Sequence, residues 1–107
     1  MKSMTSPGDL PFDLYLSFEP TTKLSKIVRL FTRDGWETRM CSWTEYEIES
    51  EDVDLTLIPS SPPLLSGGVL NSSATVDRIL SVLNAAGLAY SYEVFDENDS
   101  VCRSGSS

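Results

Sequence analysis

The stretch WTEYEIESEDVDLTLI, residues 43–58, determines how the rest of the chain is interpreted. Glutamates occupy every second position in its first half: Glu45, Glu47, Glu49 and Glu51. After a turn at residues 50–52, apolar residues recur with the same period: Val53, Leu55 and Leu57. A period of two places alternate side chains on opposite faces of an extended strand. We therefore predict a β-hairpin, with arms at residues 38–49 and 53–58, that has one apolar face and one acidic face.

Two further strands and two helices follow from the same kind of periodicity. Residues 12–19 and 88–95 alternate between apolar and polar side chains, which predicts half-buried strands. Helices are indicated by apolar residues at i, i+3, i+4 and i+7, first at Leu24, Ile27, Val28 and Phe31, then at Val76, Ile79, Leu80 and Leu83. The expected N-terminal caps are Thr21 or Thr22 and Ser72 or Ser73, and the expected C-terminal residues are Gly35 and Gly87.

The resulting order β-α-β-β-α-β predicts an α+β, ferredoxin-like fold, with a four-stranded antiparallel sheet and two helices on one face. Residues 59–71, PSSPPLLSGGVLN, are expected to form a long loop because prolines and glycines interrupt regular structure. We expect a flexible N-terminal arm at residues 1–11, a single domain at residues 12–96 and a flexible C-terminal tail at residues 97–107. One face of the sheet would then remain uncovered by helices.

The composition narrows the class of partner. The 107 residues contain 16 acidic and 8 basic side chains, giving a net charge of −8, and the sequence pI is near 4.3. Such a surface repels nucleic acid and anionic membranes and favours a basic protein, although charge of this size also serves solubility alone. We expect no secretory signal, because residues 1–11 lack an apolar run, and no membrane span, because no apolar run reaches the roughly 20 residues that a span requires. With only Cys41 and Cys102 as thiols, we expect a cytoplasmic protein.

The predicted partner-binding residues are the outward-facing acids and aromatics: Tyr15, Trp43, Glu45, Glu47, Glu49, Asp52, Asp54 and Glu93. Carboxylates bind arginine in bidentate fashion, and exposed aromatic rings supply contact area. An equally weighted alternative is that the glutamates protect an edge strand from aggregation. The chain has no histidine, no cofactor loop and no calcium-loop spacing, so we expect no enzyme activity, cofactor or metal.

These observations predict an acidic binding module that neutralises a basic protein, as an immunity protein or an inhibitor of a toxin or nuclease does. The alternative is a regulatory ligand-sensing or dimerising ferredoxin-like domain. A two-fold axis would place glutamate against glutamate, which favours a monomer. The sequence leaves open the identity of the partner, the oligomeric state, and whether Cys41 and Cys102 pair.

Overall fold

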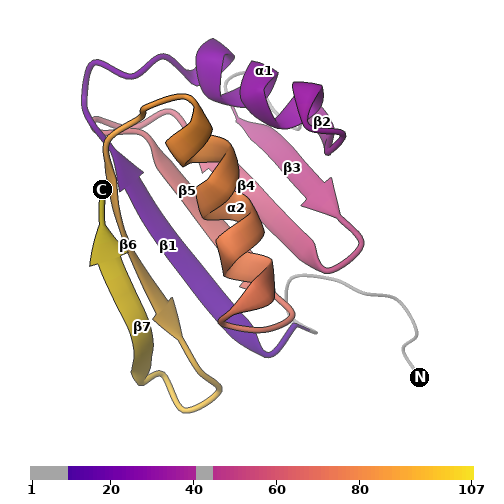
Figure 1. The fold of residues 1–107 in the computed structure, drawn as a ribbon, viewed down its shortest axis with the longest axis vertical. Coiled ribbons are helices and arrows are strands. Elements are labelled where there is room, and N and C mark those ends of the chain that lie inside the picture. Colours follow the sequence, from indigo (N-terminus) through magenta and orange to yellow (C-terminus); the bar gives the residue numbers. More distant parts are fainter. Residues whose placement is uncertain (1–9, 41–44) are drawn as a thin grey trace.

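The computed structural model describes residues 10–40 and 45–107. These residues form one seven-stranded antiparallel sheet and two helices (Figure 1). The elements in chain order are β1 (Phe12–Phe18), α1 (Leu24–Arg33), β2 (Glu37–Met40), β3 (Tyr46–Ser50), β4 (Val53–Ile58), β5 (Leu64–Val69), α2 (Ala74–Ala85), β6 (Tyr90–Phe95) and β7 (Val101–Ser106). The spatial order of the strands is β2-β3-β4-β5-β1-β6-β7.

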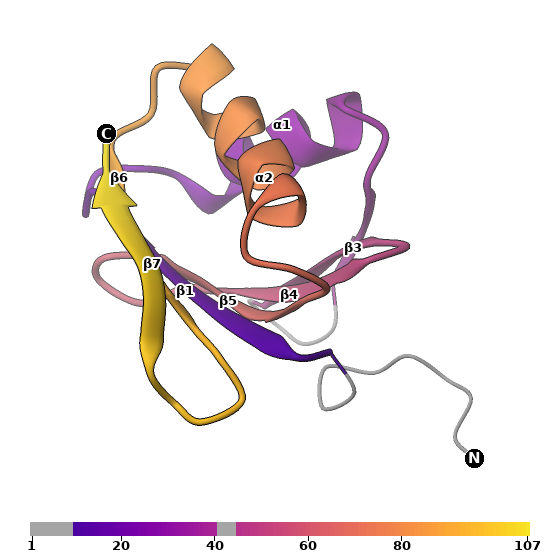
Figure 2. The same ribbon diagram turned by 60° about the horizontal axis from the view of Figure 1, so that its bottom comes forward.

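The ferredoxin-like prediction is wrong in strand number and order. The two helices do cover the same face of the sheet (Figure 2), but the predicted four-stranded sheet gains three strands. The arm predicted at residues 38–49 is two strands, β2 and β3, that pair with each other, and β5 and β7 lie in segments expected to be irregular. Helix α2 connects β5 to β6, which flank β1 on either side.

Strand β5 is the largest departure from the sequence prediction, because it pairs with β1 and β4 near the middle of the sheet. Its sequence LLSGGV contains two glycines, which are poor strand formers. Gly67 is nevertheless required by the packing. A Cβ atom at this position would lie 2.1 Å from the backbone oxygen of Asp54, so only glycine lets the two strands approach so closely.

Strand β7 occupies most of the segment predicted to be a flexible tail. Arg103 holds it against the helical layer from the centre of the strand. The Arg103 guanidinium donates hydrogen bonds to the backbone oxygen of Ser72, to the Tyr92 hydroxyl and to the Asp77 carboxylate. The Cζ atom of the Arg103 guanidinium also lies 5.7 Å from the centroid of the Tyr92 ring, within the range of a cation–π contact.

The predicted inward faces are confirmed. Leu14, Leu16, Ile48, Leu55 and Leu57 are at most 1% exposed, as expected for alternate residues of strands covered by helices. Both predicted helical stripes face this layer, with Ile27 and Phe31 buried from α1 and Val76, Ile79, Leu80 and Leu83 buried from α2. The apolar core therefore lies between the sheet and the two helices.

Both helices end in the same motif, and glycine is essential to it. Gly35 and Gly87 have φ values of +94° and +71°, as predicted for C-terminal glycines. In each case the residue after the glycine donates a backbone hydrogen bond to the residue five positions earlier, from Trp36 to Phe31 and from Leu88 to Leu83. These bonds define a Schellman motif, and the perpendicular rings of Phe31 and Trp36 supply its apolar contact.

Of the predicted N-terminal caps, Ser73 is at the cap position of α2, whereas neither Thr21 nor Thr22 is at that of α1. The cap position of α1 is Lys23, which makes no side-chain capping bond. Ser73 holds the cap position of α2, but the side-chain oxygen of Asn71 accepts the hydrogen bonds from the backbone N–H groups of Ser73 and Thr75. Neither helix in the described part of the chain is long and apolar enough to cross a membrane.

Candidate functional site

The face of the sheet opposite the helices carries two aligned rows of side chains. Directly paired residues of antiparallel strands point to the same face, so the strand register defines each row. The first row runs across the whole sheet through Arg39, Glu47, Thr56, Ser66, Tyr15, Glu93 and Ser104. The second runs through Glu37, Glu49, Asp54, Gly68, Asp13 and Phe95. The acidic groups fall into two sets, separated by the small residues Ser66 and Gly68 of β5.

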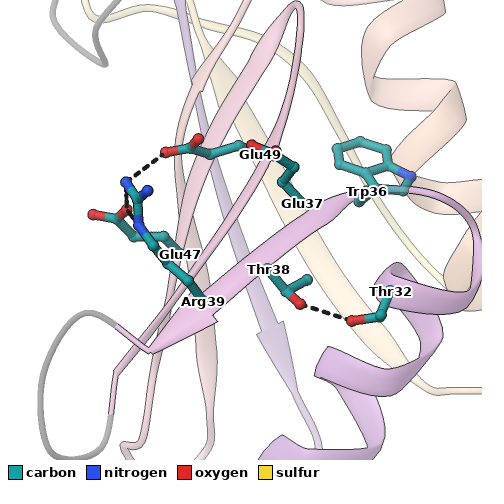
Figure 3. A pocket seen from close by; sticks show the side chains of 7 residues that line it. All are labelled: Thr32, Trp36, Glu37, Thr38, Arg39, Glu47 and Glu49. Carbon is teal, nitrogen blue, oxygen red and sulfur yellow. Dashed lines mark hydrogen bonds and ion pairs between the residues drawn. The ribbon is translucent and has the colours of Figure 1, made fainter.

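The first set, which we call the edge cluster, consists of Glu37, Arg39, Glu47, Glu49 and Asp54. Figure 3 shows Arg39 directed at two of its carboxylates. Arg39 donates from Nε and Nη2 to the same oxygen of Glu47, at 2.8 and 2.6 Å, and its Nη2 lies 3.5 Å from Glu49. The guanidinium is thus already engaged by the glutamates, although the Arg39 side chain is 68% exposed.

The edge cluster also borders a depression of about 350 Å³ that extends around β2. On the helical side of this strand, the hydroxyls of Thr32 and Thr38 are joined by a hydrogen bond of 2.7 Å, and Trp36 lies beside them (Figure 3). The Trp36 indole donates to Asp34, and the Arg78 guanidinium lies 4.9 Å from the centroid of the indole ring. The indole is therefore held by the helical layer and is 5% exposed.

Two carboxylates of the edge cluster repel each other across neighbouring strands. Glu49 and Asp54 are direct partners in the β3–β4 register. Partial burial, followed by the charge of Asp54, raises the pKa of Glu49 above its ordinary value of 4.5. Partial burial and the charge of Glu47 likewise raise the pKa of Asp54 above 3.8, and Arg39 opposes both shifts without cancelling them. A positive charge placed here would therefore be bound favourably.

The second set, which we call the aromatic site, consists of Asp13, Tyr15, Glu93, Phe95 and Asp99, and these residues line a depression of about 400 Å³. In the β1–β6 register Asp13 lies opposite Phe95, and Tyr15 lies opposite Glu93. The two rings are thus diagonal neighbours, with centroids 5.5 Å apart and planes at 84°. Tyr15 is 54% exposed.

The structure places most of the predicted binding residues on the uncovered face. Tyr15, Glu47, Glu49, Asp54 and Glu93 all belong to the two rows. Glu45 directly precedes β3 and is half-buried, and Trp43 lies outside the described residues. These residues are divided between the edge cluster and the aromatic site instead of forming one continuous surface.

Asp52 does not face outward as predicted, because the β3–β4 turn directs it to the helical side. Its carboxylate accepts hydrogen bonds from Arg78, at 2.8 Å, and from the Thr75 hydroxyl, at 3.2 Å. Arg78 also donates to the hydroxyl of Ser50. Asp52 therefore anchors α2 to the hairpin, which is a structural role.

Sequence reasoning missed Arg39 and Phe95 as members of the two sets. Arg39 lies in the predicted hairpin arm, but pairing it with Glu47 requires knowing that β2 and β3 are antiparallel neighbours. Alternation places Phe95 on the same face as Glu93, yet only the β1–β6 register brings it diagonal to Tyr15. Sequence periodicity gives the face of each residue, whereas register gives its neighbours.

Among the described residues, no group of three or more histidine, cysteine, aspartate or glutamate side chains is arranged to hold a metal ion. Cys102 is exposed on β7, and Cys41 lies outside the described residues. Comparison of the chain with protein-family models, curated proteins and solved structures finds no match.

Proposed function

We propose that the chain is an acidic binding module that neutralises a basic protein through the uncovered face of its sheet. The observation that carries this proposal is the cross-strand pair Glu49–Asp54, whose carboxylates both have raised pKa values. A fold that keeps like charges opposed on an uncovered face incurs a stability cost of roughly 0.2–1 kcal/mol. A basic partner would remove that cost on binding, and the net charge of −8 would accelerate its approach.

The functional class that best fits this profile is an inhibitor or immunity protein acting in the cytoplasm on a toxin or nuclease with a basic cleft. The role is binding and not catalysis, since the outward rows offer carboxylates, hydroxyls and rings that suit recognition of cations. The ferredoxin-like fold of the alternative is wrong, because the sheet has seven strands in a different order; ligand sensing or dimerisation stays a prediction.

One observation favours a structural role for part of the edge cluster. Strand β2 is the edge of the sheet, and Arg39 there is bound by Glu47 and Glu49. Charged side chains on a short edge strand discourage pairing with other chains. We infer that Glu47, 2.6 Å from Arg39, serves chiefly to hold it, whereas Glu49, 3.5 Å from Arg39, and Asp54 keep raised pKa values despite Arg39 and can bind a partner's cation.

Capture from a lysate of the source cells at low salt, followed by elution with salt, tests the proposal. The test bait carries Glu49→Lys and Asp54→Lys. The control bait carries Glu51→Lys and Glu97→Lys, which change the net charge equally at two exposed acids in turns. We expect the natural and control baits to retain the same basic protein, and the test bait to lose it.

The retained protein would then be purified and its affinity measured by calorimetry at several salt concentrations. We expect the affinity to fall steeply with salt, because charge attraction is screened within about 10 Å at 0.1 M. Binding that is insensitive to salt, or that survives in the test bait, would show that the acidic face does not carry the function.

A further inference from the structure

The aromatic site resembles in composition two other sites of this chain, each of which binds one of the chain's own arginine side chains. Arg78 lies over the ring of Trp36 and pairs with Asp52. Arg103 lies over the ring of Tyr92 and pairs with Asp77 at 2.6 Å. Each of these sites therefore combines an aromatic ring, a carboxylate and a guanidinium.

At the aromatic site the rings and the carboxylates are present, but none of the described residues that line the depression is basic. Asp13 and Glu93 lie on opposite sides of the diagonal formed by Tyr15 and Phe95. A perpendicular ring pair covers at most one face of one ring, so ring surface remains available beside both carboxylates. The missing component of the set is a cation.

We propose that the aromatic site is the seat for an arginine side chain of the basic partner, stacked on Tyr15 and Phe95 and paired with Asp13 or Glu93. Arginine fits better than lysine, because its planar guanidinium stacks on rings while donating two parallel hydrogen bonds to a carboxylate. This inference rests on the proposed function for the source of the arginine, but the site itself can be tested separately.

The surroundings of the seat suit a peptide segment on either side of that arginine. Tyr15 and Glu93 also border a second depression, of about 440 Å³, which continues over β6 and β7. The other side chains that line it include four serines: Ser17, Ser91, Ser104 and Ser106. Hydroxyls both donate and accept hydrogen bonds, so this surface can bind the polar backbone of a partner without adding charge.

The probe for the seat is the capped peptide acetyl-Gly-Gly-Arg-Gly-Gly-amide, titrated into the isotope-labelled full chain and followed by NMR. Its controls are the same peptide with citrulline, which keeps the shape and removes the charge, and with lysine. We expect the largest shift changes at the amides of Tyr15, Glu93 and Phe95, and weaker binding of both control peptides.

Variants of Tyr15 and Glu93 then distinguish the contribution of the aromatic rings to peptide binding from that of the carboxylates. Tyr15→Ser is expected to weaken binding of the arginine peptide about two- to fivefold, the size of an exposed cation–π contact, whereas Tyr15→Phe retains it. Glu93→Gln should also weaken binding, and Glu51→Gln, an exposed acid in the β3–β4 turn, should not. Tyr15 is exposed, so its replacement leaves the core intact, which the unchanged remainder of the spectrum verifies.

The proposal is overturned if citrulline binds as well as arginine, if the shifts spread evenly over all acidic residues, or if Tyr15→Ser has no effect. Failure of the lysate capture with successful peptide binding would reject the proposed function and keep the arginine seat. Capture that succeeds with both the natural chain and Tyr15→Ser at equal affinity would reject the seat and keep the function.

Discussion

At the scale of single residues, Gly67 is the position with the least freedom to change. The Gly67→Ala substitution forces a methyl group toward the Asp54 backbone oxygen, and φ at this residue is +154°. Because the obstacle is backbone in a central strand, we expect a loss of about 3 kcal/mol or more in the free energy of unfolding. Urea denaturation of the purified variant measures it.

The matched control is Gly35→Ala, where no atom lies within 4 Å of the added methyl group and only the left-handed backbone opposes the change. That conformation costs a residue with a side chain about 1 kcal/mol. Equal losses at the two glycines would mean that the close approach of β4 and β5 is not a constraint.

The raised pKa of Asp54 determines how this side chain affects stability as the pH changes. Because the pKa of Asp54 is higher in the folded chain than in the unfolded chain, folding disfavours its charged form. This destabilisation is absent below the unfolded pKa of 3.8 and is complete once the pH exceeds the folded pKa. Asp54→Asn should therefore raise stability at neutral pH by roughly 0.2–1 kcal/mol and leave it unchanged near pH 3.5. Thermal unfolding across this pH range, with Glu51→Gln as the control, measures the difference; greater stabilisation at low pH would contradict it.

The residue scale also shows how much of the candidate site the sequence could predict. The outward orientation of Tyr15, Glu47, Glu49, Asp54 and Glu93 follows from alternation alone. The pairing of Arg39 with Glu47 and the meeting of Tyr15 with Phe95 depend on register. Asp52 was assigned to the wrong side because alternation does not continue through a turn.

At the scale of elements, strand β7 depends on Arg103. Replacing it by alanine removes the hydrogen bonds to Ser72, Tyr92 and Asp77 and leaves their oxygen atoms without these donors. Hydrogen bonds to charged groups contribute about 1.5–3 kcal/mol, so Arg103→Ala should lower stability by a similar amount. Amide hydrogen exchange should accelerate first in β7 and at its partner residues in β6.

A suitable control is Arg29→Ala, on an exposed position of α1, which should leave exchange in β7 unchanged. If Arg103→Ala lowers protection uniformly over the whole sheet, the strand is not held separately by this side chain. If protection in β7 does not change, its pairing with β6 alone is sufficient.

The elements that the sequence predicted correctly are those with strong periodicity. Strands β1 and β6 and both helices have long alternating or helical apolar patterns, and their buried faces agree with the prediction. Strand β5 has two glycines after a proline-rich segment, so its local preferences oppose the strand that its neighbours impose. Strand β7, VCRSGS, has no alternating apolar pattern. All of its residues except Arg103 are exposed, and Arg103 contacts the helical layer through polar bonds.

At the scale of the whole molecule, the unequal distribution of charge predicts how stability responds to salt. The molecule carries a net charge of −8, and the edge cluster holds four carboxylates around one arginine. Screening this repulsion should raise the melting temperature by about 2–6 °C between about 10 and 200 mM NaCl. Scanning calorimetry at neutral pH measures the change.

The double variant Glu49→Gln/Asp54→Asn should show a smaller increase with salt, because the repelling cross-strand pair is removed. An identical increase in the two proteins would assign the effect to net charge alone. A melting temperature that falls with salt would mean that the attraction of Arg39 and Arg103 for their carboxylates outweighs the repulsion.

The central position of β1 has a consequence for the order in which the protein can be made. Strand β1 is synthesised before both of its neighbours in the sheet, which are residues 64–69 and 90–95. At translation speeds of about 5–20 residues per second, roughly 4–15 s separate the synthesis of β1 from that of β6. During that interval Leu14, Leu16 and Phe18 have no completed sheet to enter. Until β5 is made, β1 has neither of its neighbours in the sheet. We therefore expect the nascent chain to bind chaperones that recognise short hydrophobic segments.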